Sequence, residues 1–227
     1  MNDVSAFLRG GIAPELVETF TALLRGADNA SAAEMLSDLC DQGVGAEAIM
    51  LDLFAPAACV LGEMWCRDEA NFLDVTLGLG RIHRLLRRLE MPVEAARPRG
   101  AVLLLPVPGE HHVLGLRIVE EFLLRAGWRV HLTVTDEVAG LRRLLADRPY
   151  DIIGVSISSE RLLPVLRSVI SEVRAVSCNP DIRIMVGGAI LSGGDVDGPG
   201  LGADAIVRDA QAAVEQADVW FSLVGAE

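Results

Sequence analysis

The stretch GAVLLLPVP, residues 100–108, is an unbroken apolar run with glycine at one end and proline at the other. Such a run is typical of a parallel strand that is covered on both faces of its sheet. From here to the C-terminus, strand patterns and helix patterns alternate. The strands are predicted over 100–108, 129–135, 150–158, 181–190 and 203–208, and the helices over 113–127, 137–149, 162–177 and 209–224. This alternation predicts a doubly wound, five-stranded parallel sheet of flavodoxin-like or Rossmann type, with strand order 2-1-3-4-5 and right-handed crossovers.

The residues before this sheet follow a different period. Their apolar residues recur at helical spacing, which predicts helices over 14–27, 31–43, 46–65 and 72–90. Helices that follow one another this closely predict an antiparallel bundle. We therefore expect an α/β chain with a helical bundle over 1–91, a Pro/Arg/Gly linker over 92–100 and the sheet domain over 101–227.

The composition limits the function. The chain has 227 residues, 51% of them hydrophobic, and a formal net charge of −12. A globular protein of this charge would repel phosphate backbones, so we expect a small ligand or a basic protein partner and no direct binding of nucleic acid. The sequence shows no signal peptide or membrane span, which predicts a cytoplasmic protein. The cysteines have no metal-site spacing and are interpreted as reduced, small buried side chains: Cys40, Cys59, Cys66 and Cys178.

Doubly wound sheets bind ligands at the carboxyl ends of their strands, which directs attention to the loop VPGEHHVLG, residues 107–115. A neutral His112 imidazole there could bind a metal through one nitrogen while Glu110 accepts a hydrogen bond from the other. His111 is expected to point away. The chain has no nucleophile–base pair, Walker loop or Gly-x-Gly-x-x-Gly motif, so catalysis is not expected. The remaining histidines are interpreted as structural or surface residues: His83 and His131.

Three short motifs point to one kind of cofactor domain. EHHVLG at 110–115, SIS at 156–158 and GG at 187–188 resemble, in order and spacing, the Asp-x-His-x-x-Gly, Ser-x-Leu and Gly-Gly motifs of cobalamin-binding Rossmann domains. Together with the preceding bundle, they resemble the bundle-plus-Rossmann cobalamin modules of methyltransferases and light-responsive regulators. The resemblance covers most of the chain.

This resemblance implies a cofactor site. In the family, the histidine replaces dimethylbenzimidazole as the lower cobalt ligand, and the displaced nucleotide tail enters a slot beside the sheet. His112 is thereby the implied metal ligand, while serine hydroxyls and glycines without side chains would receive the tail. The implied cofactor-binding residues are Trp65, Glu110, His112, Val113, Leu114, Gly115, Ser156, Ser158, Gly187 and Gly188.

The sequence departs from the family pattern in three places. Glu110 stands where the family has aspartate, and Ser158 stands where it has leucine. Trp65 lies in a segment that resembles the one whose tryptophan covers the upper face of the corrin, although an ordinary core aromatic is the other interpretation. Photosensory relatives place Glu-His at the positions of Val75 and Thr76. A light switch that captures cobalt with that histidine is therefore not present in its usual form.

The segment FLDVTLGLGRIHRLL, residues 72–86, more closely resembles the AerR/PpaA regulators of photosynthesis genes and the related domain called "sensor containing heme instead of cobalamin". This resemblance implies a tetrapyrrole cofactor, cobalamin or alternatively heme, and a non-catalytic antirepressor that binds a DNA-bound repressor protein of the PpsR/CrtJ kind. A corrinoid protein that carries methyl groups between methyltransferases is a second hypothesis. A flavodoxin-like domain for another small ligand is a third. The upper cobalt ligand, light or redox as the input, and the oligomeric state stay open.

Overall fold

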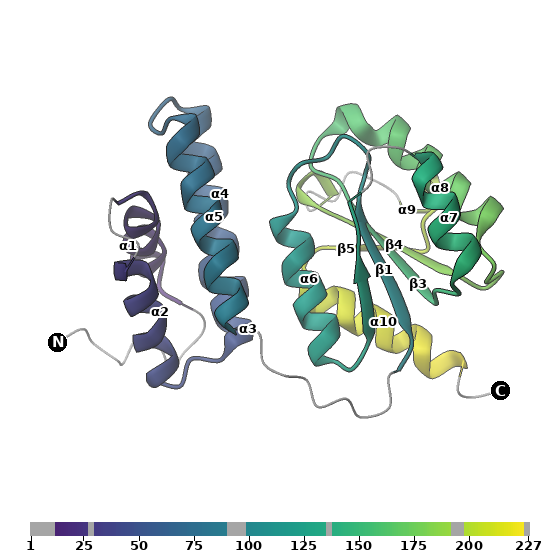
Figure 1. The fold of residues 1–227 in the computed structure, drawn as a ribbon, viewed down its shortest axis with the longest axis horizontal. Coiled ribbons are helices and arrows are strands. Elements are labelled where there is room, and N and C mark those ends of the chain that lie inside the picture. The colour runs from purple at the N-terminus through teal and green to yellow at the C-terminus, as the bar shows by residue number, and fades with distance from the viewer. Residues whose placement is uncertain (1–11, 27–29, 90–98, 135–137, 192–197, 225–227) are drawn as a thin grey trace. The chain divides into compact units, whose positions relative to one another are not determined.

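The chain folds into two compact units, Met1–Pro92 and Val93–Glu227 (Figure 1). The computed structural model describes residues 12–26, 30–89, 99–134, 138–191 and 198–224. Most of the predicted linker over 92–100 lies outside these described residues. Each unit has its own set of packed elements, and each is considered by itself below.

The C-terminal unit is built on a five-stranded sheet in which every strand pair is parallel. The strand order is β2-β1-β3-β4-β5, so the predicted doubly wound topology is confirmed. The stretch that opens this unit forms β1, in the interior of the sheet between β2 and β3. The strands are β1 (Ala101–Pro106), β2 (Arg129–Leu132), β3 (Ile152–Ser156), β4 (Arg183–Gly187) and β5 (Ala205–Val207).

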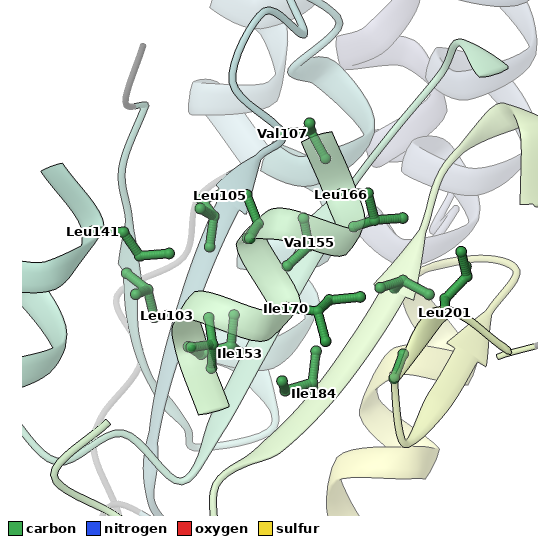
Figure 2. Close-up of a cluster of buried hydrophobic side chains, with 14 of the residues drawn as sticks. Leu103, Leu105, Val107, Leu141, Ile153, Val155, Leu166, Ile170, Ile184 and Leu201 are labelled. Carbon is green, nitrogen blue, oxygen red and sulfur yellow. The ribbon is translucent and has the colours of Figure 1, made fainter. Parts of the chain in front are cut away.

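Helices cover both faces of this sheet (Figure 1). Leu103 and Leu105 of β1 pack on the face that α7 and α8 cover, in the cluster shown in Figure 2. Val102 and Leu104 point the other way and pack with α6 and α10. Because both sets are buried, β1 needs the unbroken apolar run from which it was predicted. The helices are α6 (Leu114–Arg125), α7 (Val138–Asp147), α8 (Leu163–Val176), the short α9 (Gly198–Leu201) and α10 (Ala210–Val224).

The N-terminal unit is helical, as predicted. Its core contains Phe20 and Phe54, whose rings stack with centroids 5.6 Å apart. Helices α1, α4 and α5 pack against one another, and α2 packs against α1. The elements are α1 (Pro14–Arg25), α2 (Ala30–Asp41), α3 (Ala46–Ala48), a π-helical stretch (Ile49–Phe54), α4 (Ala55–Cys66) and α5 (Phe72–Leu89).

Pro56 accounts for the π-helical stretch. A proline inside a helix cannot donate a hydrogen bond to the carbonyl four residues earlier, and its ring clashes with that carbonyl. Just before it, the amide of Ala55 donates to the carbonyl of Met50, five residues back. This wider turn accommodates the proline. The chain is therefore helical without a break from Ala46 to Cys66.

By length and composition alone, the helix Ala46–Cys66 could cross a membrane. Two further features are those of a core helix in a bundle. Its polar side carries Glu47, Asp52 and Glu63. Its apolar side is fully buried within the unit at Ile49, Met50, Leu53, Phe54, Ala57 and Leu61.

The cysteines differ from their interpretation as small buried side chains, because all four are exposed. The helix period explains Cys40 in α2 and Cys59 in α4. Cys40 is one residue from the buried Leu39, and Cys59 is two residues from the buried Leu61. Residues one or two apart on a helix point to different sides, so both cysteines lie outside the buried stripe of their helix. The general tendency of cysteine to be buried is overridden by position.

A close backbone contact joins the ends of β3 and β4. The amide of Ile157 donates to the carbonyl of Gly187 over 2.9 Å. The next residue, Gly188, has a φ of +121°, which other residues rarely adopt. A Cβ atom at Gly188 would lie 2.0 Å from the carbonyl oxygen of Ile157. No side chain fits at this position without displacing the loop.

We therefore expect Gly188→Ala to lower the free energy of unfolding by about 3 kcal/mol or more, through backbone strain and overlap. Urea denaturation followed by circular dichroism measures the loss. Gly115→Ala is the matched control, because a Cβ at Gly115 meets nothing within 4 Å. Since Gly115 lies in α6, alanine there should be neutral or stabilise by up to about 1 kcal/mol. A Gly188 variant as stable as the wild type would contradict the contact.

Candidate functional site

Two loops meet at the carboxyl end of the sheet. Pro106, the last residue of β1, pairs with Ser156, the last residue of β3. The amide of Val107 then donates to the carbonyl of Ser156 over 3.0 Å, and Gly109 turns the chain with a φ of +86°. The amide of Glu110 donates back to the carbonyl of Val107 over 2.8 Å. This turn places Glu110 beside the loop that follows β3.

Glu110 is a buried carboxylate at this junction, with only 4% of the residue exposed. Its Oε1 accepts hydrogen bonds from the amide and Nδ1 of His112, at 2.8 and 2.6 Å. Its Oε2 accepts hydrogen bonds from the amide and hydroxyl of Ser158, at 2.7 and 2.6 Å. Each loop thus contributes two donors, and a buried charge is tolerated only when such donors replace water.

These contacts determine the charge on Glu110. Burial by itself would raise the pKa of this carboxyl group. The hydrogen bonds from Ser158 and His112 together outweigh burial and lower the pKa from 4.5 to about 2. The carboxylate is therefore ionised at neutral pH and can only accept hydrogen bonds.

His112 is fixed through one ring nitrogen while most of its side chain, 75%, is exposed. Because the ionised Glu110 cannot donate, the hydrogen between Oε1 and Nδ1 belongs to Nδ1. In the neutral ring, Nε2 then carries the available lone pair. The predicted contact between these residues is present, and it selects the tautomer in which Nε2 can bind a metal. Metal binding by His112 itself stays a prediction.

Ser158 makes hydrogen bonds within the protein that the resemblance does not imply. There, Ser156 and Ser158 both offer hydroxyls to the nucleotide tail. In the structure, the hydroxyl of Ser158 donates to Glu110 and lies 2.9 Å from Nδ1 of His112. Ser156 is half-buried at the end of β3. The role of Ser158 was missed because it depends on which loops are neighbours, and no local sequence signal carries that information.

The fold itself requires glycine at position 188 and leaves little room for a side chain at position 187. A Cβ atom at Gly187 would lie 3.1 Å from the carbonyl oxygen of Val207 in β5, and one at Gly188 would overlap Ile157. Their lack of side chains therefore has a structural reason without any ligand. The slot for the nucleotide tail at these residues stays a prediction.

The other residues of the first motif begin helix α6. Leu114 is buried and anchors the first turn, and the half-buried Val113 precedes it. Gly115 is exposed, and open space lies where a Cβ would be. His111 is exposed as well. The beginning of the helix, just after His112, therefore has an uncrowded surface.

Trp65 lies in the other unit, at the end of α4, and is 50% exposed. The interpretation as an ordinary core aromatic is therefore wrong. Its ring packs edge-on against that of Phe72, with centroids 6.5 Å apart. Leu73 and Leu77, one turn apart on α5, are also exposed. Of these exposed side chains, Trp65 and Phe72 pack together, and exposed aromatic surface of this kind is typical of a binding site.

The positions where photosensory relatives place Glu-His also lie on α5. Val75 is buried within the bundle. Thr76 is exposed, and its hydroxyl donates to the carbonyl of Phe72 over 2.8 Å. Neither side chain has the nitrogen that the photosensory histidine supplies to cobalt.

The two histidines interpreted as structural make contacts within the protein. Nδ1 of His83 lies 3.0 Å from the carbonyl oxygen of Leu79. Nδ1 of His131 lies 2.7 Å from the hydroxyl of Tyr150. In the part of the chain that the structure describes, no three His, Cys, Asp or Glu side chains gather as a metal site.

A family model and a relative both match the chain. The model of the B12 binding domain matches residues 100–218, from just before β1 into α10. In Rhodobacter capsulatus, an uncharacterized 20.5 kDa protein in the bchF-crtJ intergenic region is 30% identical over 172 residues, which cover 74% of this chain and 87% of that protein. These matches agree with the resemblance to cobalamin-binding regulators of the AerR/PpaA kind.

The fold also occurs in solved structures. The monomethylamine corrinoid protein of Methanosarcina barkeri has a TM-score of 0.70 and 16% identity, and the match covers 90% of this chain and 98% of that one. At this identity the similarity shows the fold alone. The family is shown by the model match, which spans more than half of the sequence. The chain therefore belongs to the B12 binding domain family, and its cofactor is cobalamin.

Proposed function

We propose that the chain is a cobalamin-binding transcriptional regulator, which relieves repression by binding a DNA-bound repressor of the PpsR/CrtJ kind. The observation that carries the cofactor role is the buried Glu110, which holds His112 with Nε2 available. The regulatory role is supported by the Rhodobacter relative, which is named for its place in the bchF-crtJ intergenic region. The net charge of −12 also suits a basic protein partner.

The residues present fit a cobalamin whose lower ligand is His112. An imidazole whose Nδ1–H is held by a carboxylate is a fixed and strengthened nitrogen donor. The bound cobalamin would supply a cobalt centre with exchangeable axial ligands. In this proposal, Glu110 orients the imidazole of His112, and the exposed Trp65 remains a candidate cofactor contact. Heme is the less favoured cofactor, because the family match is to B12 binding domains.

One observation favours a second function. The fold is that of the monomethylamine corrinoid protein, and a methyl carrier would use the same His112 with a methyltransferase as its partner. The identity to that protein is 16%, whereas the Rhodobacter relative reaches 30%. We therefore place the regulator first and the methyl carrier second.

Replacing the proposed cobalt ligand should change cofactor binding without unfolding the chain, because His112 is mostly exposed. We expect His112→Ala to weaken binding of hydroxocobalamin by about tenfold or more and to shift the bound absorbance spectrum toward the base-off form. His111→Ala is the matched control, since His111 is the exposed neighbour. An unchanged spectrum and affinity for His112→Ala would remove this residue as the ligand.

Glu110→Gln should reveal the contribution of the buried charge to stability. The folded-state pKa of about 2 lies below the usual 4.5. The charge therefore contributes about 3 kcal/mol above pH ~5, and this contribution is lost as the pH falls through ~2. We expect the difference in unfolding free energy between wild type and variant to shrink as the pH falls over this range. Urea denaturation at several pH values measures it. Glu160→Gln, at an exposed glutamate, is the control.

Partner binding separates the two functions. We expect the cobalamin-loaded chain to form a complex with a repressor of the PpsR/CrtJ kind in size-exclusion chromatography and to release that repressor from operator DNA in a mobility-shift assay. The chain alone should not shift the DNA, because its net charge is −12. A complex with a corrinoid-dependent methyltransferase, and none with the repressor, would favour the methyl carrier instead.

A further inference from the structure

A groove lies between α1 and α4 in the N-terminal unit, on residues that the proposed cofactor site does not use. Its volume is about 270 Å³. Pockets for drug-sized molecules usually measure about 300–1,000 Å³, so a groove of this size suits a few side chains of a polypeptide segment. The residues that line it are spaced by three or four positions along each helix: Glu18, Thr21 and Arg25 of α1, and Val60, Met64 and Arg67 in or just after α4.

The middle of the groove is apolar. Val60 and Met64 lie there half-buried, and only 2% of Thr21 is exposed. The hydroxyl of Thr21 donates to the carbonyl of Val17 over 2.7 Å, so it is already used within α1. An apolar side chain that enters here would therefore leave water without burying an unpaired hydroxyl.

The two ends of the groove differ in the charged groups that they offer. Glu18 is at one end, and the guanidinium groups of Arg25 and Arg67 are at the other. Each arginine has one carboxylate partner, Asp74 at 3.9 Å and Glu63 at 3.0 Å respectively. The Nε of Arg25 is buried and has no hydrogen-bond partner in the part of the chain that the structure describes. Since a guanidinium has five donors, this end can bind a further carboxylate.

The segment DVSAFLRGG, residues 3–11, lies in the sequence just before α1 and outside the described residues. Its apolar residues recur at positions i, i+3 and i+4, which is the spacing of one face of a helix. An acidic residue comes before them and a basic residue after them. In order, these residues are Asp3, Val4, Phe7, Leu8 and Arg9.

We propose that residues 3–9 dock in this groove, folded back along α1. Arg9 then pairs with Glu18, the apolar residues cover the middle, and Asp3 meets the guanidinium groups at the other end. The opposite direction would bring Asp3 to Glu18, where like charges repel, so the order of the charges specifies the direction. The docking needs no cofactor, and it goes beyond the proposed function.

The lengths agree with this arrangement. The two charged residues of the segment are six positions apart, which is ~9 Å along a helix, and Glu18 and Arg25 are seven apart, which is ~10.5 Å. An extended segment would span ~20 Å and overshoot the groove. Gly10 and Gly11 follow the segment and permit the reversal of the chain before α1. A helix this short is marginal by itself, so the groove must supply the contacts that order it.

Hydrogen–deuterium exchange of the full chain, read by mass spectrometry of peptides that contain residues 3–11, tests the docking. A short connection gives the segment an effective concentration of about 1 mM at the groove. Docking with a Kd of about 0.1 mM then makes the docked state about tenfold more populated than the free state. The amides of residues 7–9, which are hydrogen-bonded in such a helix, should exchange about tenfold more slowly than in the unfolded chain.

Two variants remove the apolar contact from either side. We expect Phe7→Ser, which removes the largest apolar side chain of the segment, and Val60→Asp, which places a charge in the groove, each to abolish this slowing. Val219→Asp is the matched control, because Val219 is an exposed valine on α10 in the other unit. Circular dichroism shows whether each variant is folded.

A charge exchange tests the direction. We expect Glu18→Arg to reduce the slowing about threefold, the scale of an exposed ion pair, and Glu18→Arg/Arg9→Glu to restore it. Glu18 is exposed, so its replacement leaves the packing of α1 unchanged. Glu15→Arg is the matched control, since Glu15 is exposed on α1 and does not line the groove.

Three results would overturn the inference: fast exchange of the segment in the wild type, slow exchange that persists in both Phe7→Ser and Val60→Asp, or a charge exchange that restores nothing. Slow exchange that disappears on dilution would mean that a second copy supplies the segment, and it would overturn docking within one chain. None of these measurements involves cobalamin, so failure of the docking and failure of the proposed function are distinguishable.

Discussion

A carboxylate removed from water needs donors to replace its lost solvation, and this requirement organises the carboxyl end of the sheet. Glu110 meets it with four hydrogen bonds, two from each of two loops. The buried charge consequently ties the β1 loop to the β3 loop and fixes the ring of His112 at the same time. The same four hydrogen bonds of Glu110 therefore stabilise the junction of the two loops and orient the ring of His112.

The folds of the C-terminal sheet unit and of the N-terminal helical unit were predictable, because the sequence patterns that indicate them are periodic and local. The apolar run of β1 reflects burial on both faces, and the alternation of strands with helices leaves few topologies. The contact between Glu110 and His112 was also predictable, since the two residues lie two positions apart in one loop. Short elements such as α9 were missed, because a single turn is too short to show a period.

What the sequence could not show depends on contacts between distant segments. The contact of Ser158 with Glu110 exists only because β1 and β3 are neighbours. Glycine is required at position 188 because a Cβ atom there would overlap the backbone of Ile157. Ile157 lies in the loop after β3, and α8 and β4 separate the two residues in the chain. By their motifs, both Ser158 and Gly188 were expected to receive the nucleotide tail of the cofactor. The structure shows that a residue can match a binding motif and still be needed first by the protein itself.

The exposed position of Trp65 has a consequence for how the molecule can be observed. The chain has three tryptophans, and the other two, Trp128 and Trp220, are buried in the sheet unit. Trp65 is therefore the single solvent-facing indole, with a red-shifted emission that can be separated from that of the others. A corrin absorbs in the range where tryptophan emits, so quenching of tryptophan emission would report cofactor binding without any added label.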